Sequence, residues 1–153
     1  MVAGIKLATE EDVRWMAPRL RQADKDEVMA SGGRTAEEAL KESFEASEPC
    51  FAAINSQDEP VALFGTCPLT DNVGAIWLLG TNSIDDEPIS FLRWSKKFLP
   101  FVLEPYDLVC NFVDARNTVH IKWLRWLGFS FLRRVNRGPY QLPFYEFARL
   151  KYV

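Results

Sequence analysis

Two polar residues three positions apart, Asn117 and His120, are the strongest candidates for chemistry in this chain of 153 residues. Both lie near the start of a predicted amphipathic helix that ends at Gly128. His120 is the only histidine, and imidazole is the side chain whose ordinary pKa best suits acid–base catalysis near neutrality. The alternative is that His120 packs at the helix edge or bonds to backbone, while Asn117 only caps the helix.

The segment that positions these residues spans 107–131 and predicts a buried strand, a polar turn, a helix and a second strand. Asn117 suits the helix start because its side chain can accept a bond from a free backbone N–H. Gly128 suits the helix end because glycine adopts the left-handed conformation without strain. The turn that joins the first strand to the helix is therefore the predicted location of any site.

Before this segment, the pattern predicts a strand at 5–8 and two helices capped by Thr9 and Thr35. Three strands at 50–54, 61–66 and 74–79 then form an antiparallel meander.

A long helix is expected to start at 85–88, with Asp85 as its cap and Pro88 near its first turn, and to end near Leu99 because Pro100 follows. A last strand at 144–150 completes the order βααβββαβαββ. The order predicts one α/β (α+β) domain over residues 1–153.

The composition favours a folded globular protein and gives no sign of a nucleic-acid-binding, metal-binding or membrane-spanning protein. Hydrophobic residues make up 48% of the chain and charged residues 25%, which is typical of a folded globular protein. A net charge of −3 gives no reason to expect a nucleic-acid partner, and no metal site is predicted. Cys50, Cys67 and Cys110 lack any paired spacing and are expected to be free thiols in a reducing compartment. With no signal peptide or apolar run of about 20 residues, we expect a cytoplasmic protein, or one packaged from a cytoplasm into a virion.

The helix segment carries a family resemblance. Asn117, followed by Trp123, Leu124 and then Gly128-Phe129, is similar to the pattern N-x-x-A-x-x-L-Y-x-x-x-G-F of the GNAT superfamily of N-acyltransferases. The predicted element order resembles the same family over nearly the whole chain. Residues 117–129 also resemble GNAT-like proteins of tailed phages, some similar to internal virion proteins and others called acetyltransferases.

This resemblance implies a mostly antiparallel, splayed sheet flanked by helices, with acyl-CoA inserted between the strands at 74–79 and 107–113. Backbone groups of Leu78, Leu79 and Gly80 would pair with the pantetheine arm, and Asn117 would approach the cofactor. His120 would be the candidate acid–base residue.

Two departures from the family pattern argue against the enzyme. The phosphate loop, 80–88, has one glycine and no basic residue, and it places Asp85, Asp86 and Glu87 where the cofactor's pyrophosphate would lie. Leu124 stands where many members carry a tyrosine that donates a proton.

Two hypotheses follow from the sequence. One is an acetyl-CoA-dependent N-acyltransferase with weakened motifs. The other is a non-catalytic phage protein that binds a protein partner, either inside the virion or in the host.

Overall fold

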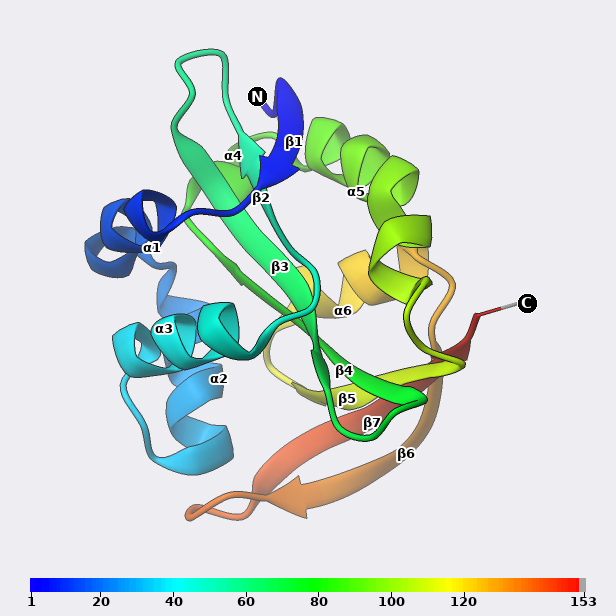
Figure 1. Ribbon diagram of the computed structural model, residues 1–153. Helices are drawn as coiled ribbons and strands as arrows, with labels where there is room; N and C mark the ends of the chain where they lie inside the picture. Colours follow the sequence, from blue (N-terminus) through cyan, green and yellow to red (C-terminus); the bar gives the residue numbers. More distant parts are fainter. Residues whose placement is uncertain (152–153) are drawn as a thin grey trace.

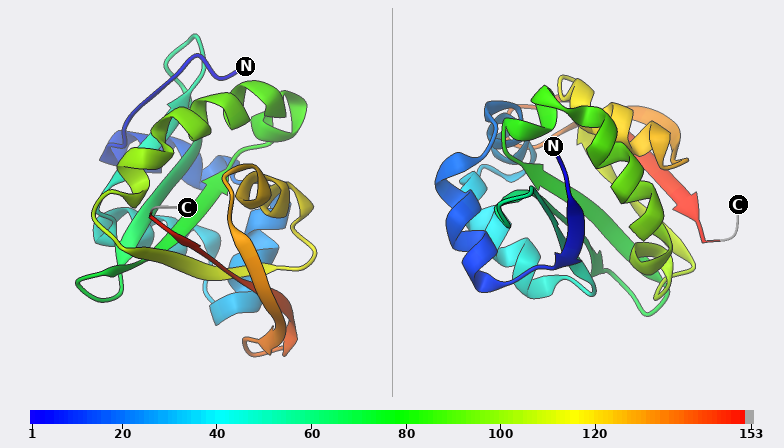
Figure 2. Two further views of the ribbon diagram at one scale, coloured as in Figure 1. Left: turned by 90° about the vertical axis from the view of Figure 1, so that its right-hand side faces the viewer. Right: turned by 90° about the horizontal axis from the view of Figure 1, so that it is seen from above.

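The computed structural model describes residues 1–151, which form a seven-stranded sheet with helices on both faces (Figure 1, Figure 2). The sheet order is β1-β2-β3-β4-β5-β7-β6. The strands are β1 (Gly4–Leu7), β2 (Cys50–Ile54), β3 (Pro60–Pro68), β4 (Val73–Gly80), β5 (Leu108–Asp114), β6 (Ser130–Arg137) and β7 (Leu142–Leu150). The helices are α1 (Glu10–Met16), a 3-10 turn η1 (Ala17–Arg19), α2 (Gln22–Gly32), α3 (Ala36–Ala46), α4 (Ser83–Asp86), α5 (Pro88–Leu103) and α6 (Thr118–Trp126).

The α/β sheet expected from the sequence is confirmed, and all neighbouring strands except β4 and β5 are antiparallel. The two faces carry separate hydrophobic clusters because successive side chains of a strand point to opposite sides. Leu63 packs with α1 and α3, whereas Phe64 packs with α5 and α6. Both faces are covered, so β3 is buried along most of its length.

The predicted caps are confirmed at three helices. Thr9 and Asp12 form a reciprocal capping box at α1, and Thr35 accepts a bond from the Glu38 N–H at α3. Asn117 caps α6. Gly128 adopts the left-handed conformation, with a φ of 86°, which turns the chain out of α6 into β6.

The long helix starts at Pro88, as predicted, with the proline in its first turn, but its predicted cap and its predicted end were wrong. Asp85 is not its cap: it lies in α4, and Glu87 stands at the N-cap of α5 without a side-chain capping bond. Pro100 does not end the helix, which continues to Leu103. The final turn buries Val102 and Leu103 against the sheet, and this apolar burial offsets the single hydrogen bond that proline cannot make.

The sequence also predicted too few helices. Two are predicted between β1 and β2, where the structure has three, and the additional one is α2. Among the described residues, no helix is both long enough and apolar enough to cross a membrane.

Candidate functional site

The candidate site lies where β4 and β5 separate. These strands run parallel and pair only at their first residues, from Val73 opposite Leu108 to Ala75 opposite Cys110. Beyond this point the two strands are no longer paired, and α2 and α6 approach the opening (Figure 1). A cavity of about 140 Å³ lies there. It is lined by residues from α2, α3, β4, β5 and α6, among them Glu27, Leu78, Asn111 and His120.

Asn117 is held by α2. Its side-chain oxygen accepts from the His120 N–H at 3.4 Å and from Arg21 Nη1 at 3.3 Å. Its side-chain amide donates to Asp24 Oδ1 at 2.9 Å. Only 2% of Asn117 is exposed, so the helix cap also joins α6 to the start of α2 through a buried polar network.

The same network occupies the end of β4. The Gly80 N–H donates to Asp24 Oδ2 at 2.9 Å, and the Gly80 carbonyl accepts from the Arg21 N–H at 2.9 Å. Because Thr81 donates to Val61 of β3, strand alternation directs the Gly80 groups toward the β5 side, into the opening. The side chain of Ile84 also lies directly over Gly80, leaving no room there for even a methyl group.

The other two backbone positions singled out by the sequence lie in different settings. Leu79 is opposite Leu63, and alternation directs its backbone groups toward β3. Leu78 presents its groups to the opening, as Gly80 does. Two residues before Leu78, the Ile76 carbonyl accepts from Asn111 Nδ2 at 2.9 Å. Leu78 is therefore the one position of the three whose backbone faces the opening and has no partner outside the sheet among the described residues.

Asp24 is the centre of the network. Its side chain is 1% exposed and forms an ion pair with Arg21 at 2.8 Å. Burial raises the pKa of Asp24, although Arg21, Asn117, His120 and the Gly80 N–H each favour the charged carboxylate. Arg21 also reaches the loop at 80–88, called the acidic loop below because it carries Asp85, Asp86 and Glu87. Arg21 Nη2 lies 3.3 Å from Asp85. The acidic loop is thereby tied to the network.

The loop at 80–88 places carboxylates and a proline where a phosphate would need hydrogen-bond donors. α4 carries Asp85 and Asp86 in its single turn, Glu87 occupies the N-cap of α5, and Pro88 has no N–H. The amino group of Met1 pairs with Glu87 at 3.3 Å. The positive end of the α5 dipole is consequently faced by the chain's own carboxylate.

His120 is paired with a residue that the sequence did not single out. His120 Nδ1 lies 3.2 Å from Glu27 Oε2, and Glu27 Oε1 accepts from the Asp114 N–H at 2.8 Å. In the neutral ring, Nδ1–H donates to the carboxylate, which leaves a lone pair on Nε2. Nε2 is buried and has no hydrogen-bond partner among the described residues. This is the arrangement of a carboxylate-oriented histidine base.

Burial by itself would lower the pKa of His120, but Glu27 and Asp24 outweigh it and raise the pKa. We therefore expect the free energy of unfolding to fall as pH rises through the folded-state pKa of His120, because the charged ring is favoured in the folded state. The effect is full below pH 6.5 and is at most about 1.4 kcal/mol per pH unit. Urea unfolding from pH 6 to 8.5 measures it. Glu27→Gln should flatten the slope, and an unchanged slope would contradict the assignment to this pair.

The surroundings of Leu124 and Cys110 do not suit a catalytic role. Leu124 is fully buried in the cluster under α5 and α6. Cys110 is a free thiol whose pKa is raised, mainly by burial and then by Glu146, so it is a poor nucleophile.

Arg21, Asp24 and Glu27 were missed because α2 itself was missed. Their spacing of three places them on one face of a helix, which is a signal available in the sequence. It was not recognised because the N-cap residue of α2, Arg21, makes no side-chain capping bond, and because the helix buries Asp24 and Ala30 rather than an apolar stripe.

Comparisons with solved structures support the architecture. The aminoglycoside acetyltransferase AAC(6')-Ib, in complex with ribostamycin and coenzyme A, is 15% identical, with a TM-score of 0.69 over 96% of this chain and 92% of that one. Spermidine N-acetyltransferase from Vibrio cholerae, in complex with CoA and spermine, is 10% identical, with a TM-score of 0.66 over 96% and 94%. A GCN5-related N-acetyltransferase from Kribbella flavida is 12% identical, with a TM-score of 0.69 over 95% and 96%.

No protein-family model matches the sequence, and no curated protein is significantly similar to it. At sequence identities of 10–15%, the similarity to these structures shows a shared fold and does not show a shared reaction. The chain has the fold of the GNAT N-acetyltransferases.

Proposed function

We propose that this protein uses the GNAT fold as a binding protein and does not hold acetyl-CoA in the pose that the fold implies. The observation that carries this proposal is that the backbone N–H and carbonyl of Gly80 already have hydrogen-bond partners within the chain. Both of its backbone groups that face the opening are bonded to Asp24 and Arg21. A pantetheine arm paired with this end of β4 would have to displace a buried ion pair.

The residues around Gly80 also do not fit a pyrophosphate. Asp85, Asp86 and Glu87 would repel it, and the one arginine nearby, Arg21, is already bonded to Asp24 and Asp85. A cavity of about 540 Å³ does lie between α5 and α6, and Lys122 contributes to it. Arg21 and Asp85 also line this cavity and are paired with each other, so Lys122 is its one lining cation that forms no ion pair with the described residues. The rest of the lining is apolar.

Isothermal titration with acetyl-CoA tests the proposal. We expect no saturable heat at ligand concentrations up to about 1 mM, the range in which many enzymes bind their substrates. The control is the triple variant Asp85→Asn/Asp86→Asn/Glu87→Gln. It removes the negative charge of the loop but keeps the hydrogen bonds of Gly80 to Asp24 and Arg21. It should also fail to bind. Micromolar binding by the wild type would overturn the proposal, and binding by the triple variant alone would assign the barrier to charge rather than to Gly80.

A second candidate function rests on His120 Nε2. This atom is buried, unpartnered among the described residues and oriented by Glu27, so it could take a proton from an amine bound in the cavity. Proton removal from an amine is the step an N-acyltransferase of this fold would need.

An assay for thiol release from acetyl-CoA with a panel of primary amines separates the two candidates. Under the binding proposal, release equals the blank. If release is found, Glu27→Gln and His120→Gln should lower it by about 10²-fold or more. Equal rates in these variants would remove the pair from the reaction.

The partner we propose is a protein, either a phage virion component or a host protein, in keeping with the resemblance of residues 117–129 to phage proteins. Mass spectrometry of purified particles tests the first and affinity capture from host lysate tests the second. Absence from both would contradict this assignment.

A further inference from the structure

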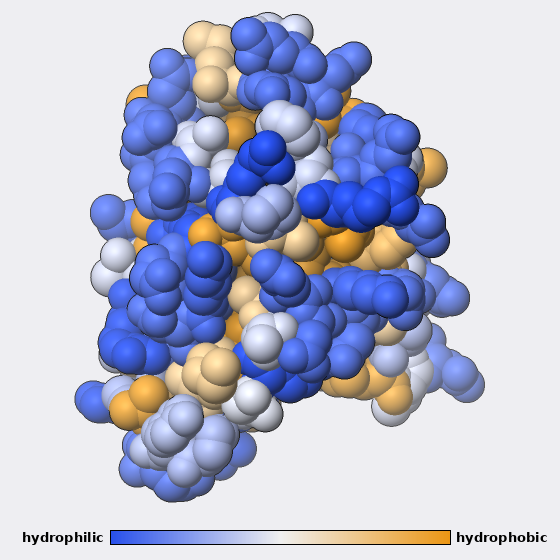
Figure 3. Space-filling view, turned by 90° about the vertical axis from the view of Figure 1, so that its left-hand side faces the viewer, coloured by the Kyte–Doolittle hydropathy of each residue, from blue (hydrophilic) through white to orange (hydrophobic). Residues whose placement is uncertain are grey.

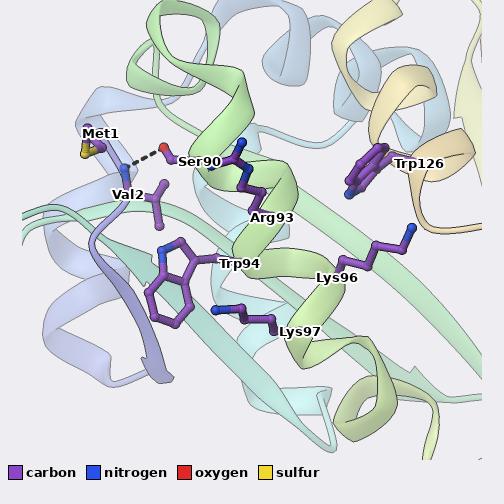
Figure 4. A pocket seen from close by; sticks show the side chains of 8 residues that line it. All are labelled: Met1, Val2, Ser90, Arg93, Trp94, Lys96, Lys97 and Trp126. Atoms are coloured by element: carbon purple, nitrogen blue, oxygen red, sulfur yellow. Dashed lines mark hydrogen bonds between the residues drawn. The ribbon is translucent and has the colours of Figure 1, made fainter.

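The outer face of α5 carries a groove of about 590 Å³ (Figure 4), which shares no lining residue with the cavity at the β4–β5 opening. One end of the groove is formed by the first residues of the chain, and the other by Trp126 of α6. Eight residues line it: Met1, Val2, Ser90, Arg93, Trp94, Lys96, Lys97 and Trp126.

Three cations and no carboxylate line this groove, although the whole chain has a net charge of −3. Arg93, Lys96 and Lys97 are exposed, and none of them forms an ion pair with any of the described residues. Two of them instead contact aromatic rings: Lys96 Nζ lies 4.4 Å from the ring centre of Trp126, and Lys97 Nζ lies 4.8 Å from that of Trp94. Their positive charge is thus available to an anionic partner.

The groove also has an ordered apolar surface. Trp126 is 43% exposed, and its indole N–H donates to the Leu92 carbonyl at 2.8 Å, which fixes the ring. The N-terminal wall is fixed as well, because the Val2 N–H donates to Ser90 Oγ at 2.9 Å (Figure 4). Trp126 is therefore a half-exposed tryptophan held in place beside Lys96, and such residues often dominate protein–protein binding energy.

The geometry points to an acidic protein segment with a large apolar side chain as the occupant of this groove. Carboxylates would pair with Arg93, Lys96 and Lys97, and the apolar side chain would pack against the exposed ring of Trp126 (Figure 4). The partner's negative charge complements the three cations of the groove. This inference rests on the proposed binding function, and it names the surface that function would use.

The contacts of the lysines favour a peptide over single-stranded nucleic acid. Bases bind such proteins by stacking on aromatic rings. Here the rings of Trp94 and Trp126 each have a lysine ammonium over one face, so a base could not stack on that face unless the lysine moved. A carboxylate can pair with the same ammonium while it stays over the ring.

Fluorescence anisotropy with a labelled 12-residue peptide of glutamates, leucines and one phenylalanine tests the inference. We expect saturable binding that weakens as salt rises, and at least about tenfold weaker binding to Arg93→Glu/Lys96→Glu/Lys97→Glu. Trp126→Ala should weaken binding about tenfold or more. The same peptide with glutamine for glutamate should bind poorly. Thermal melting confirms that these variants fold.

The matched control reverses three cations on the face of α1–α3, which is covered mainly by hydrophilic residues (Figure 3). Arg14→Glu/Lys25→Glu/Lys41→Glu changes the net charge equally and should leave binding unchanged. Equal loss in both triples, absence of saturable binding, or tighter binding of oligo(dT) that displaces the peptide would overturn the inference. The two proposals can fail separately. The peptide titration contains no cofactor, so a negative result there counts against the groove alone. Binding of acetyl-CoA in the calorimetric titration would overturn the proposed function and would not count against the groove.

Discussion

Replacing Asp24 with alanine is expected to lower the free energy of unfolding by about 3–5 kcal/mol, the range for removing one partner of a buried ion pair. The substitution leaves the buried guanidinium of Arg21 without its nearest carboxylate. It also removes the acceptor for the Asn117 amide and for the Gly80 N–H. Chemical denaturation at neutral pH measures the change.

Asp26→Ala is the matched control, since Asp26 lies on the same helix but is exposed and accepts one side-chain bond, from Gln22. It should cost less than about 0.5 kcal/mol, as surface substitutions usually do. Similar losses in the two variants would mean that the Asp24 network contributes little to the connection between α2, β4 and α6.

Replacing Trp123 with alanine should cost a comparable amount, about 3–5 kcal/mol. Trp123 is 1% exposed and lies between the sheet and α5, where it stacks on Phe91 and meets Phe64 edge-on. Its removal would leave a cavity between β3, α5 and α6, because its ring contacts residues of both β3 and α5. Thermal or urea unfolding measures the loss.

Two related variants separate cavity formation from the loss of the indole N–H. Trp123→Phe retains an aromatic ring and removes an N–H that is buried without a partner among the described residues, so it should cost much less than alanine. Trp126→Ala, three residues later on α6, removes a half-exposed ring and should cost about 1 kcal/mol, close to the typical point mutation. A loss in Trp126→Ala as large as in Trp123→Ala would contradict the packing described here.

Most of the fold was predictable because its local signals are strong. The three-strand meander, the caps at Thr9, Thr35 and Asn117, and the left-handed Gly128 follow from turn residues and hydrophobic alternation. The structure confirms each of them. These signals are local, and they agree with one another.

The errors fall where tertiary contacts override local preference. Pro100 ends an isolated helix, yet the buried side chains of Val102 and Leu103 carry α5 past it. α2 has little apolar surface, and its helical face is defined instead by polar residues that bond to β4 and α6. No hydrophobic stripe could reveal a helix whose buried residues are Asp24 and Ala30.

The candidate site was predictable only in part for the same reason. Asn117 and His120 could be selected from the sequence because one stands at a cap position and the other is the only histidine. Their partners, Asp24 and Glu27, lie 93 residues earlier, and only the fold brings them together. The sequence indicated an unfavourable loop charge, whereas the occupied edge of β4 is a property of the three-dimensional structure.

The most direct test of the central claim follows the backbone amide of Gly80 by ¹⁵N-resolved NMR during titration with acetyl-CoA. Because this N–H donates to the buried Asp24 carboxylate, its signal should exchange slowly with solvent and should not move as the cofactor is added. The amide of Leu78, which also faces the opening, provides an internal comparison. A saturable shift of the Gly80 signal at micromolar acetyl-CoA would contradict the claim that the chain itself holds this edge of β4 closed.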